Sequence, residues 1–104
     1  MTSDEKIFGY LGLAERAGKM ASGEFMVETA VKKGKARVVL VAGDASENTK
    51  KQFRNMCEYY DVPCYEIADK ARLGKAIGKE FRASCAVTDD GLAKAVLKVM
   101  RQEI

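Results

Sequence analysis

The side chains with the clearest chemical potential are the cations and the single aromatic ring of residues 69–82. This stretch holds five cations and two acids, so its net charge of +3 equals that of the whole chain. Lys and Arg pair with phosphates, and an exposed ring stacks on an unpaired base, so the segment favours an RNA ligand. An inward ring that closes the end of a sheet fits the sequence equally well. The cations are Lys70, Arg72, Lys75, Lys79 and Arg82, the acids are Asp69 and Glu80, and the ring is Phe81.

A second candidate is the expected helix start at Ser22-Gly23. Backbone N–H groups at a helix N-terminus attract anions, and a glycine lets a phosphate approach closely. The alternative is a simple helix cap. Glu24 favours this alternative, because a carboxylate in the first turn interacts with the helix dipole itself and repels phosphate.

Four further cations, Lys32, Lys33, Lys35 and Arg37, surround Gly34 at the expected end of the same helix. Cations there complement the helix dipole, and most such runs are solvated. Gly23 and Lys33 would be about 15 Å apart along the helix, so one nucleic acid could reach both.

Signals for catalysis are weak. The chain has no histidine, and no glycine spacing matches a phosphate loop or a dinucleotide fingerprint. Three cysteines without a C-x-x-C pair predict neither a zinc site nor a disulfide framework, so we expect small core hydrophobes and no cofactor. A magnesium site at Asp44, Asp89 and Asp90 is conceivable, but the sequence favours turn and cap roles for these residues.

Alternating helix and strand patterns predict one α/β domain over residues 1–104. Thr2 and Glu5 form a capping box for a first helix that stops at Gly18, and Asp69 caps a short helix. The expected strands are Met20–Ala21, Arg37–Ala42, Cys64–Ile67 and Cys85–Thr88. The second helix is expected to open at Ser22-Gly23 and end at Gly34, and the third to be capped by Asp44-Ala45-Ser46 and stopped by Val62-Pro63. The last two expected helices are Ala71–Ile77, which the glycines at 74 and 78 break up, and Leu92–Met100, with Asp90-Gly91 as a turn. The third helix should bury Phe53, Met56, Cys57 and Tyr60.

No secretory signal and no membrane-spanning stretch is visible, because the longest apolar run is only Val38–Ala42. The sequence therefore predicts a cytoplasmic protein.

Several segments together resemble the ribosomal L7Ae/L30e family of kink-turn RNA-binding proteins, and within it the small bacterial YlxQ-type members. The resemblance runs from about Phe8 to Leu97. Three pieces carry it: Ala17-Gly18-Lys19 to Ser22-Gly23; Ala30 to Ala36 with the following strand; and Val62-Pro63 through Leu73-Gly74 and Gly78 to Ala86-Val87.

The resemblance implies a three-layer α/β/α sandwich with a central four-stranded mixed sheet, no catalytic activity and structured RNA as the partner. It also implies which residues contact the RNA, at the start of the second helix and in a loop before the last strand. The implied RNA-binding residues are Lys19, Gly23, Glu24, Phe25, Met26, Lys33, Lys70, Lys79, Glu80, Phe81 and Arg82.

One motif departs from the family pattern. Members that read kink-turns strongly carry Gly-x-Asn-Glu-x-x-Lys, whereas Phe25, Met26 and Thr29 replace the Asn, Glu and Lys here. Hydrogen-bonded readout of guanine edges would be largely lost, while phosphate contact and stacking would survive. We therefore expect a non-enzymatic protein that binds structured RNA or ribosomal RNA. We expect neither a membrane nor a small-molecule substrate as a partner. The alternative is a protein–protein adaptor that uses Phe25 and Met26 as an apolar contact.

Overall fold

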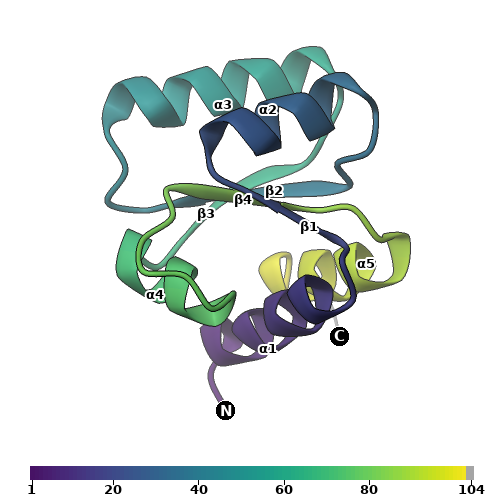
Figure 1. Cartoon of the computed structure of the whole chain (residues 1–104), viewed down its shortest axis with the longest axis vertical. Coiled ribbons are helices and arrows are strands. Elements are labelled where there is room, and N and C mark those ends of the chain that lie inside the picture. Colours follow the sequence, from purple (N-terminus) through teal and green to yellow (C-terminus); the bar gives the residue numbers. More distant parts are fainter. Residues whose placement is uncertain (103–104) are drawn as a thin grey trace.

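The computed structural model describes residues 1–102 and contains five helices and four strands in that range (Figure 1). The helices are α1 (Ser3–Arg16), α2 (Glu24–Lys32), α3 (Glu47–Tyr59), α4 (Lys70–Ala76) and α5 (Asp90–Met100). The strands are β1 (Met20–Ser22), β2 (Val38–Ala42), β3 (Cys64–Ile67) and β4 (Ser84–Val87).

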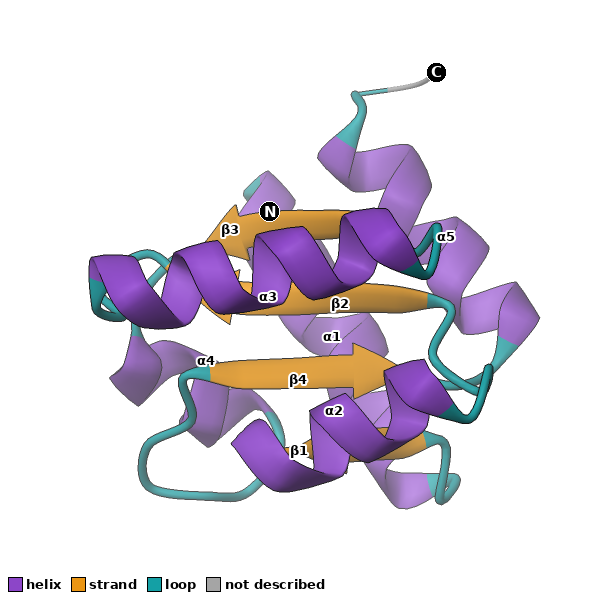
Figure 2. Cartoon of the chain, turned by 90° about the horizontal axis from the view of Figure 1, so that it is seen from above, coloured by secondary structure: helices purple, strands orange, loops and turns teal. Residues whose placement is uncertain are grey.

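The strands form one mixed sheet in the order β1-β4-β2-β3 (Figure 2). β4 is antiparallel to both of its neighbours, while β2 and β3 are parallel. Cys85 of β4 lies opposite Ser22 of β1 on one side and Leu40 of β2 on the other. This register places the last residue of β1 and the first residues of β4 at the same end of the strands.

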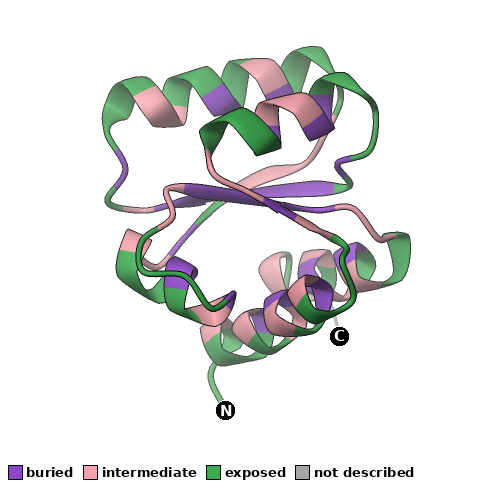
Figure 3. Ribbon diagram, viewed as in Figure 1, coloured by how far each residue is buried: buried purple, intermediate pink, exposed green. Residues whose placement is uncertain are grey.

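Helices cover both faces of the sheet, so the molecule is a three-layer α/β/α sandwich (Figure 1). The central strand β2 is buried throughout, because its alternating side chains enter two different cores. Val38, Leu40 and Ala42 pack with α1, α4 and α5, and Val39 and Val41 pack with α2 and α3. The buried residues follow the sheet and the inner faces of the helices (Figure 3). The expected fold class is confirmed.

Most of the predicted capping is confirmed. Thr2 and Glu5 form the capping box of α1, and Asp69 caps α4 through its side chain. The predicted turn at Asp90-Gly91 is wrong: these residues form the first turn of α5, since the Asp89 carboxylate accepts a hydrogen bond from Leu92 N and starts the helix two residues earlier.

Two details of the predicted helices are also wrong. Tyr60 is 40% exposed and not part of the core, because α3 ends at Tyr59 and the chain then turns away. Gly74 does not break α4 but lies inside it, buried. Within residues 1–102, no helix has the length and apolarity to cross a bilayer.

Candidate RNA interface

The start of α2 follows β1 directly and is shaped by Gly23, whose φ of 87° is rarely accessible to other residues. The Gly23 N–H donates to the carbonyl oxygen of Ser84 at 3.1 Å, which attaches the helix start to β4. No side chain caps the helix. Phe25 and Met26 in its first turn point outward, with exposed fractions of 76% and 53%. The helix start is therefore open, and its most prominent side chains are apolar.

The predicted basic loop, residues 79–82, follows α4 and is held against it by two glycines. Gly78 has a φ of 74° and ends the helix. The Lys79 N–H then donates to the Gly74 carbonyl at 2.8 Å, a C-terminal helix cap. A Cβ atom on Gly74 would lie 2.7 Å from the Glu80 carbonyl oxygen, so only glycine allows the loop to pass this close.

Arg82 joins the loop to the start of α2. Its Nε donates to Ser22 Oγ at 3.3 Å, and its Nη1 donates to the Phe81 carbonyl at 2.8 Å. Its backbone N–H donates to the Lys70 carbonyl at 3.1 Å. The two segments that the sequence singled out independently thus lie side by side. We call the surface of Gly23–Met26, Lys70 and Lys79–Arg82 the loop–helix surface.

Phe81 lies outward, with 61% of its surface exposed, so the interpretation of an inward ring is wrong. Its ring lines a hollow of about 600 Å³ together with Asp44, Asp69, Lys70 and Ala71. Both carboxylates are already engaged by the backbone: Asp44 Oδ1 accepts from Lys70 N at 2.8 Å and Asp69 Oδ1 from Arg72 N at 2.7 Å. Asp44 therefore helps to hold the backbone of Lys70 in place. The acidic wall makes this hollow better suited to the edge of a base than to a phosphate.

Two predicted site residues lie elsewhere. The Lys19 carbonyl accepts from Thr88 N at 2.9 Å, at the far end of β4 from Ser84. Lys33 follows the last residue of α2, and the helix runs away from the loop–helix surface (Figure 2). Lys19 and Lys33 therefore sit at the opposite end of the sheet from Phe81 and Arg82.

Partners also engage some of the cations around Gly34. Lys32 Nζ lies 2.7 Å from Glu28 Oε1, and this hydrogen bond raises the pKa of the exposed Lys32. Arg37 Nε lies 2.9 Å from Asp90 Oδ1, and its Nη1 donates to the Gly34 carbonyl. Such pairs reduce the attraction of this end for a polyanion.

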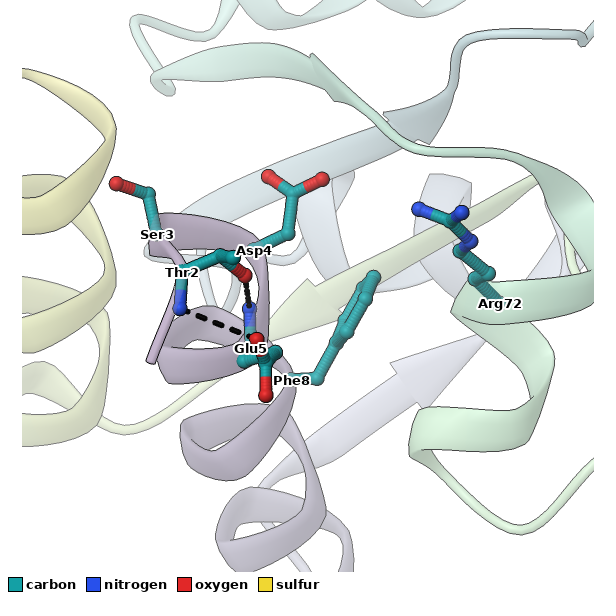
Figure 4. A pocket seen from close by; sticks show the side chains of 6 residues that line it. All are labelled: Thr2, Ser3, Asp4, Glu5, Phe8 and Arg72. Carbon is teal, nitrogen blue, oxygen red and sulfur yellow. Dashed lines mark hydrogen bonds between the residues drawn. The ribbon is translucent and has the colours of Figure 1, made fainter.

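A separate hollow of about 610 Å³ lies between the start of α1 and Arg72 (Figure 4). Its Thr2 and Glu5 groups satisfy each other in the capping box, with both hydrogen bonds at 3.1 Å. None of its lining residues except Arg72 belongs to the basic stretch found in the sequence. Among the residues described, no group of three or more His, Cys, Asp or Glu side chains is placed to hold a metal.

The sequence reasoning missed the supporting roles of Ser22 and Gly74. The sequence pattern predicts a helix cap at Ser22 and a helix break at Gly74, and neither prediction includes these supporting roles. A glycine inside an otherwise good helix pattern is a usable signal, because it often marks a close backbone approach. Nothing in the sequence indicated that Ser22 would meet Arg82, because the pairing depends on the strand order.

The chain is a small α/β/α sandwich protein. A basic loop that carries Phe81 lies beside the start of one of its helices. The model of the ribosomal protein L7Ae/L30e/S12e/Gadd45 family matches residues 5–97. The chain therefore belongs to this family, which is non-enzymatic, and the resemblance seen in the sequence is confirmed.

Two similar bacterial proteins carry the name RNA-binding protein YlxQ. That of Bacillus subtilis is 43% identical over 93 residues, covering 89% of this chain and 93% of its own. That of Enterococcus faecium is 42% identical over 90 residues, covering 86% of both chains.

Two solved structures are similar in fold. A Bacillus halodurans protein described as of unknown function has a TM-score of 0.89 and 33% identity, with 92% of this chain and 97% of that chain covered. The Giardia lamblia 15.5kD RNA binding protein has a TM-score of 0.83 and 20% identity, covering 96% and 86%. At 20% identity, the similarity to the Giardia lamblia protein shows a shared fold and nothing more.

Proposed function

We propose that this chain binds structured RNA, kink-turn-like or ribosomal, through the loop–helix surface. One observation carries the proposal: Arg82 and Ser22 hold a basic, aromatic loop beside an open helix start. The relatives named RNA-binding proteins support it. The chain, residues 1–104, then acts as one RNA-binding domain in the cytoplasm, where cellular RNA lies, with the ribosome as a candidate assembly.

The proposed contacts divide by chemistry. Lys79, Arg82 and Lys70 pair with phosphates, and the amides at the Gly23 helix start receive a further phosphate oxygen. Phe81 stacks on an unpaired base, whose polar edge enters the hollow beside Asp44. Carboxylate oxygens with remaining lone pairs accept hydrogen bonds from base amino groups.

The reader positions of α2 favour shape and stacking over hydrogen-bonded recognition of guanine edges. Phe25 and Met26 offer no strong hydrogen-bonding side-chain groups, and both are exposed. Thr29 does not substitute for a lysine, since its hydroxyl donates to the Phe25 carbonyl at 2.9 Å within the helix. We propose that this chain prefers RNAs with a sharp bend and an extruded base, whatever pairs flank the bend.

Fluorescence anisotropy tests the proposal with three labelled RNAs of equal length: a kink-turn, the same strand fully paired, and an unstructured strand. We expect tight binding to the kinked RNA, weaker binding to the unstructured strand and the weakest to the duplex. A kink-turn whose tandem G·A pairs are replaced, but whose bend is kept by a bulge, should bind nearly as well. Equal affinity for all of these RNAs would contradict recognition of structured RNA.

A protein–protein adaptor is the second candidate, because Phe25, Met26 and Phe81 are three large exposed apolar side chains on one surface. Affinity capture from lysate before and after nuclease treatment separates the two functions. Partners that are lost with nuclease support RNA binding. Partners that remain, and that are lost in a Phe25→Ser, Met26→Ser variant, support the adaptor.

A further inference from the structure

Two cysteines meet at the end of the sheet opposite the loop–helix surface. Cys57 lies in the last turn of α3, and Cys64 is the first residue of β3. Cys57 is only 1% exposed, whereas Cys64 is partly exposed. Both pack in the core between the sheet and α3. A buried thiol therefore lies beside one that solvent can reach.

The backbone holds this arrangement from both sides of the short connection. The Val62 N–H donates to the Cys57 carbonyl at 2.8 Å, which turns the chain back after α3. The Pro63 carbonyl accepts from Val39 N at 2.9 Å, which fixes the entry into β3. Each cysteine lies in an element of secondary structure, and residues 60–63 form the short connection between those two elements.

The environment divides the two thiols by reactivity. The side chains of Cys57 and Cys64 interact with each other, and this interaction lowers the pKa of Cys64 and, together with burial, raises the pKa of Cys57. Arg54 lowers the pKa of Cys64 further, while partial burial and Glu66 oppose the shift. A thiolate is the nucleophilic form of cysteine, so Cys64 is the more reactive partner at neutral pH.

Small oxidants have a path to Cys64. A hollow of about 100 Å³ opens onto it and is lined by Val41, Lys50, Arg54, Cys64, Tyr65 and Glu66. Lys50 Nζ lies 3.3 Å from Glu66 Oε1, so the ion pair offsets part of the charge of Glu66 near the thiol. The third cysteine, Cys85, is fully buried in the other core, and burial raises its pKa to about 12.

We infer that Cys57 and Cys64 form a peroxide-sensitive thiol pair, in which Cys64 is oxidised first and Cys57 closes a reversible disulfide. The Cys64 thiolate attacks hydrogen peroxide, an S–O bond forms as the O–O bond breaks, and the departing hydroxide takes a proton to give water. The Cys57 sulfur then loses its proton and attacks the Cys64 sulfenic acid. The S–O bond breaks, and the hydroxide leaves with that proton as the second water. One peroxide is reduced as two thiols are oxidised.

The disulfide would join the end of α3 to the start of β3, and its formation protects Cys64 from irreversible over-oxidation. This inference does not depend on RNA binding, because neither cysteine contacts the loop–helix surface. Its failure would leave the proposed function untouched.

Peptide mapping tests the inference on the folded, fully reduced chain treated with stoichiometric hydrogen peroxide. Trypsin places both cysteines on one peptide, residues 55–70, and Cys85 on another. We expect the mass of the first peptide to fall by two hydrogen atoms. After cleavage of the bond between Glu58 and Tyr59, the disulfide should hold the two fragments together until a reductant separates them. The free thiols titrated with DTNB in denaturant should fall from three to one.

Variants identify the order of events. In Cys57→Ser, the Cys64 sulfenic acid has no internal partner, so dimedone should label Cys64 about tenfold or more above Cys85. Cys85→Ser should form the internal disulfide like the unaltered chain. Three free thiols after treatment, a Cys64–Cys64 dimer in place of the internal bond, or oxidation of Cys85 at the same rate as Cys64 would each overturn the inference.

Discussion

The backbone of Glu80 passes so close to Gly74 that a Cβ atom at residue 74 would lie 2.7 Å from the Glu80 carbonyl oxygen and 2.9 Å from the Phe81 nitrogen. The atoms on both sides of this contact are backbone, so neither can rotate away. Gly74, inside α4, therefore sets the position of the loop that carries Lys79, Phe81 and Arg82. A residue without a side chain sets the position of the proposed RNA contacts.

Gly74→Ala should displace the loop and destabilise the fold by about 1–3 kcal/mol, the usual cost of overpacking. The displacement should also weaken RNA binding, since Arg82 would lose its position against Ser22. Urea denaturation gives the free energy of unfolding, and anisotropy gives the affinity. An unchanged free energy of unfolding would show that the loop adapts and that Gly74 has no positioning role.

Gly9→Ala is the matched control, because Gly9 is also inside a helix but a Cβ atom there meets nothing within 4 Å. Alanine is the better helix former, so this change should stabilise the chain by about 0.5–1 kcal/mol and leave RNA affinity unchanged.

Local patterns predicted the elements well, because caps, breakers and apolar periodicity act over a few residues. Thr2, Ser46 and Asp69 each start a helix near the predicted position, and the all-apolar run Val38–Ala42 is the fully buried strand. The one misplaced helix start, at Asp90, shows how an Asp-Gly pair suggests a turn when a preceding Asp89 in fact caps a helix.

The candidate site was predictable only in pieces. Composition identified the basic loop and the open helix start, but their adjacency follows from β4 inserting between β1 and β2, a pairing between distant segments. The same topology separates Lys19 and Lys33 from Phe81, although all of them were grouped by resemblance. Side-chain direction, as for Phe81, depends on tertiary contacts that a sequence pattern does not encode.

The Arg82–Ser22 pair should couple the loop to the start of α2. We expect Ser22→Ala and Arg82→Lys to lower the free energy of unfolding, with a coupling of about 0.5–1 kcal/mol in the double-mutant cycle. Lysine keeps the charge but lacks the Nε donor that reaches Ser22, so the cycle isolates the hydrogen bond. Additive effects, within about 0.3 kcal/mol, would mean that the two residues act independently.

Phosphate contact should make binding depend on salt. With about three to five contacts, log K should fall against log salt concentration with a slope of roughly −2 to −4. Lys79→Ala with Arg82→Ala should weaken binding to all RNAs alike and flatten the slope by about one to two. Lys33→Ala with Lys35→Ala removes the same charge at the far end of the sheet and should leave affinity for a short RNA nearly unchanged. Equal losses in both double variants would indicate non-specific attraction.

Phe81→Ala should weaken binding to RNAs with an unpaired base by about 1–3 kcal/mol, the value of one stacking contact, and hardly affect a duplex. The free energy of unfolding should stay within about 0.5 kcal/mol, because the ring is 61% exposed. Tyr59→Ala is the control: this ring is 83% exposed but lies at the end of α3, away from the loop. A similar loss in both variants would exclude a specific stacking role for Phe81.

The departure of α2 from the family pattern can be tested by restoring that pattern. The triple variant Phe25→Asn, Met26→Glu, Thr29→Lys supplies the amide, carboxylate and ammonium that could read sheared G·A pairs. The helix should tolerate it, since Phe25 and Met26 are exposed, a carboxylate in the first turn complements the dipole, and Thr29 bonds only to the helix backbone. We expect affinity for a kink-turn with tandem G·A pairs to rise about tenfold or more, given that one good hydrogen-bonded pair discriminates by about 1–3 kcal/mol. Affinity for the bulged RNA without G·A pairs should not rise, which separates base reading from a change in charge. A triple variant that gains nothing on either RNA would mean that the first turn of α2 does not meet the bases at all.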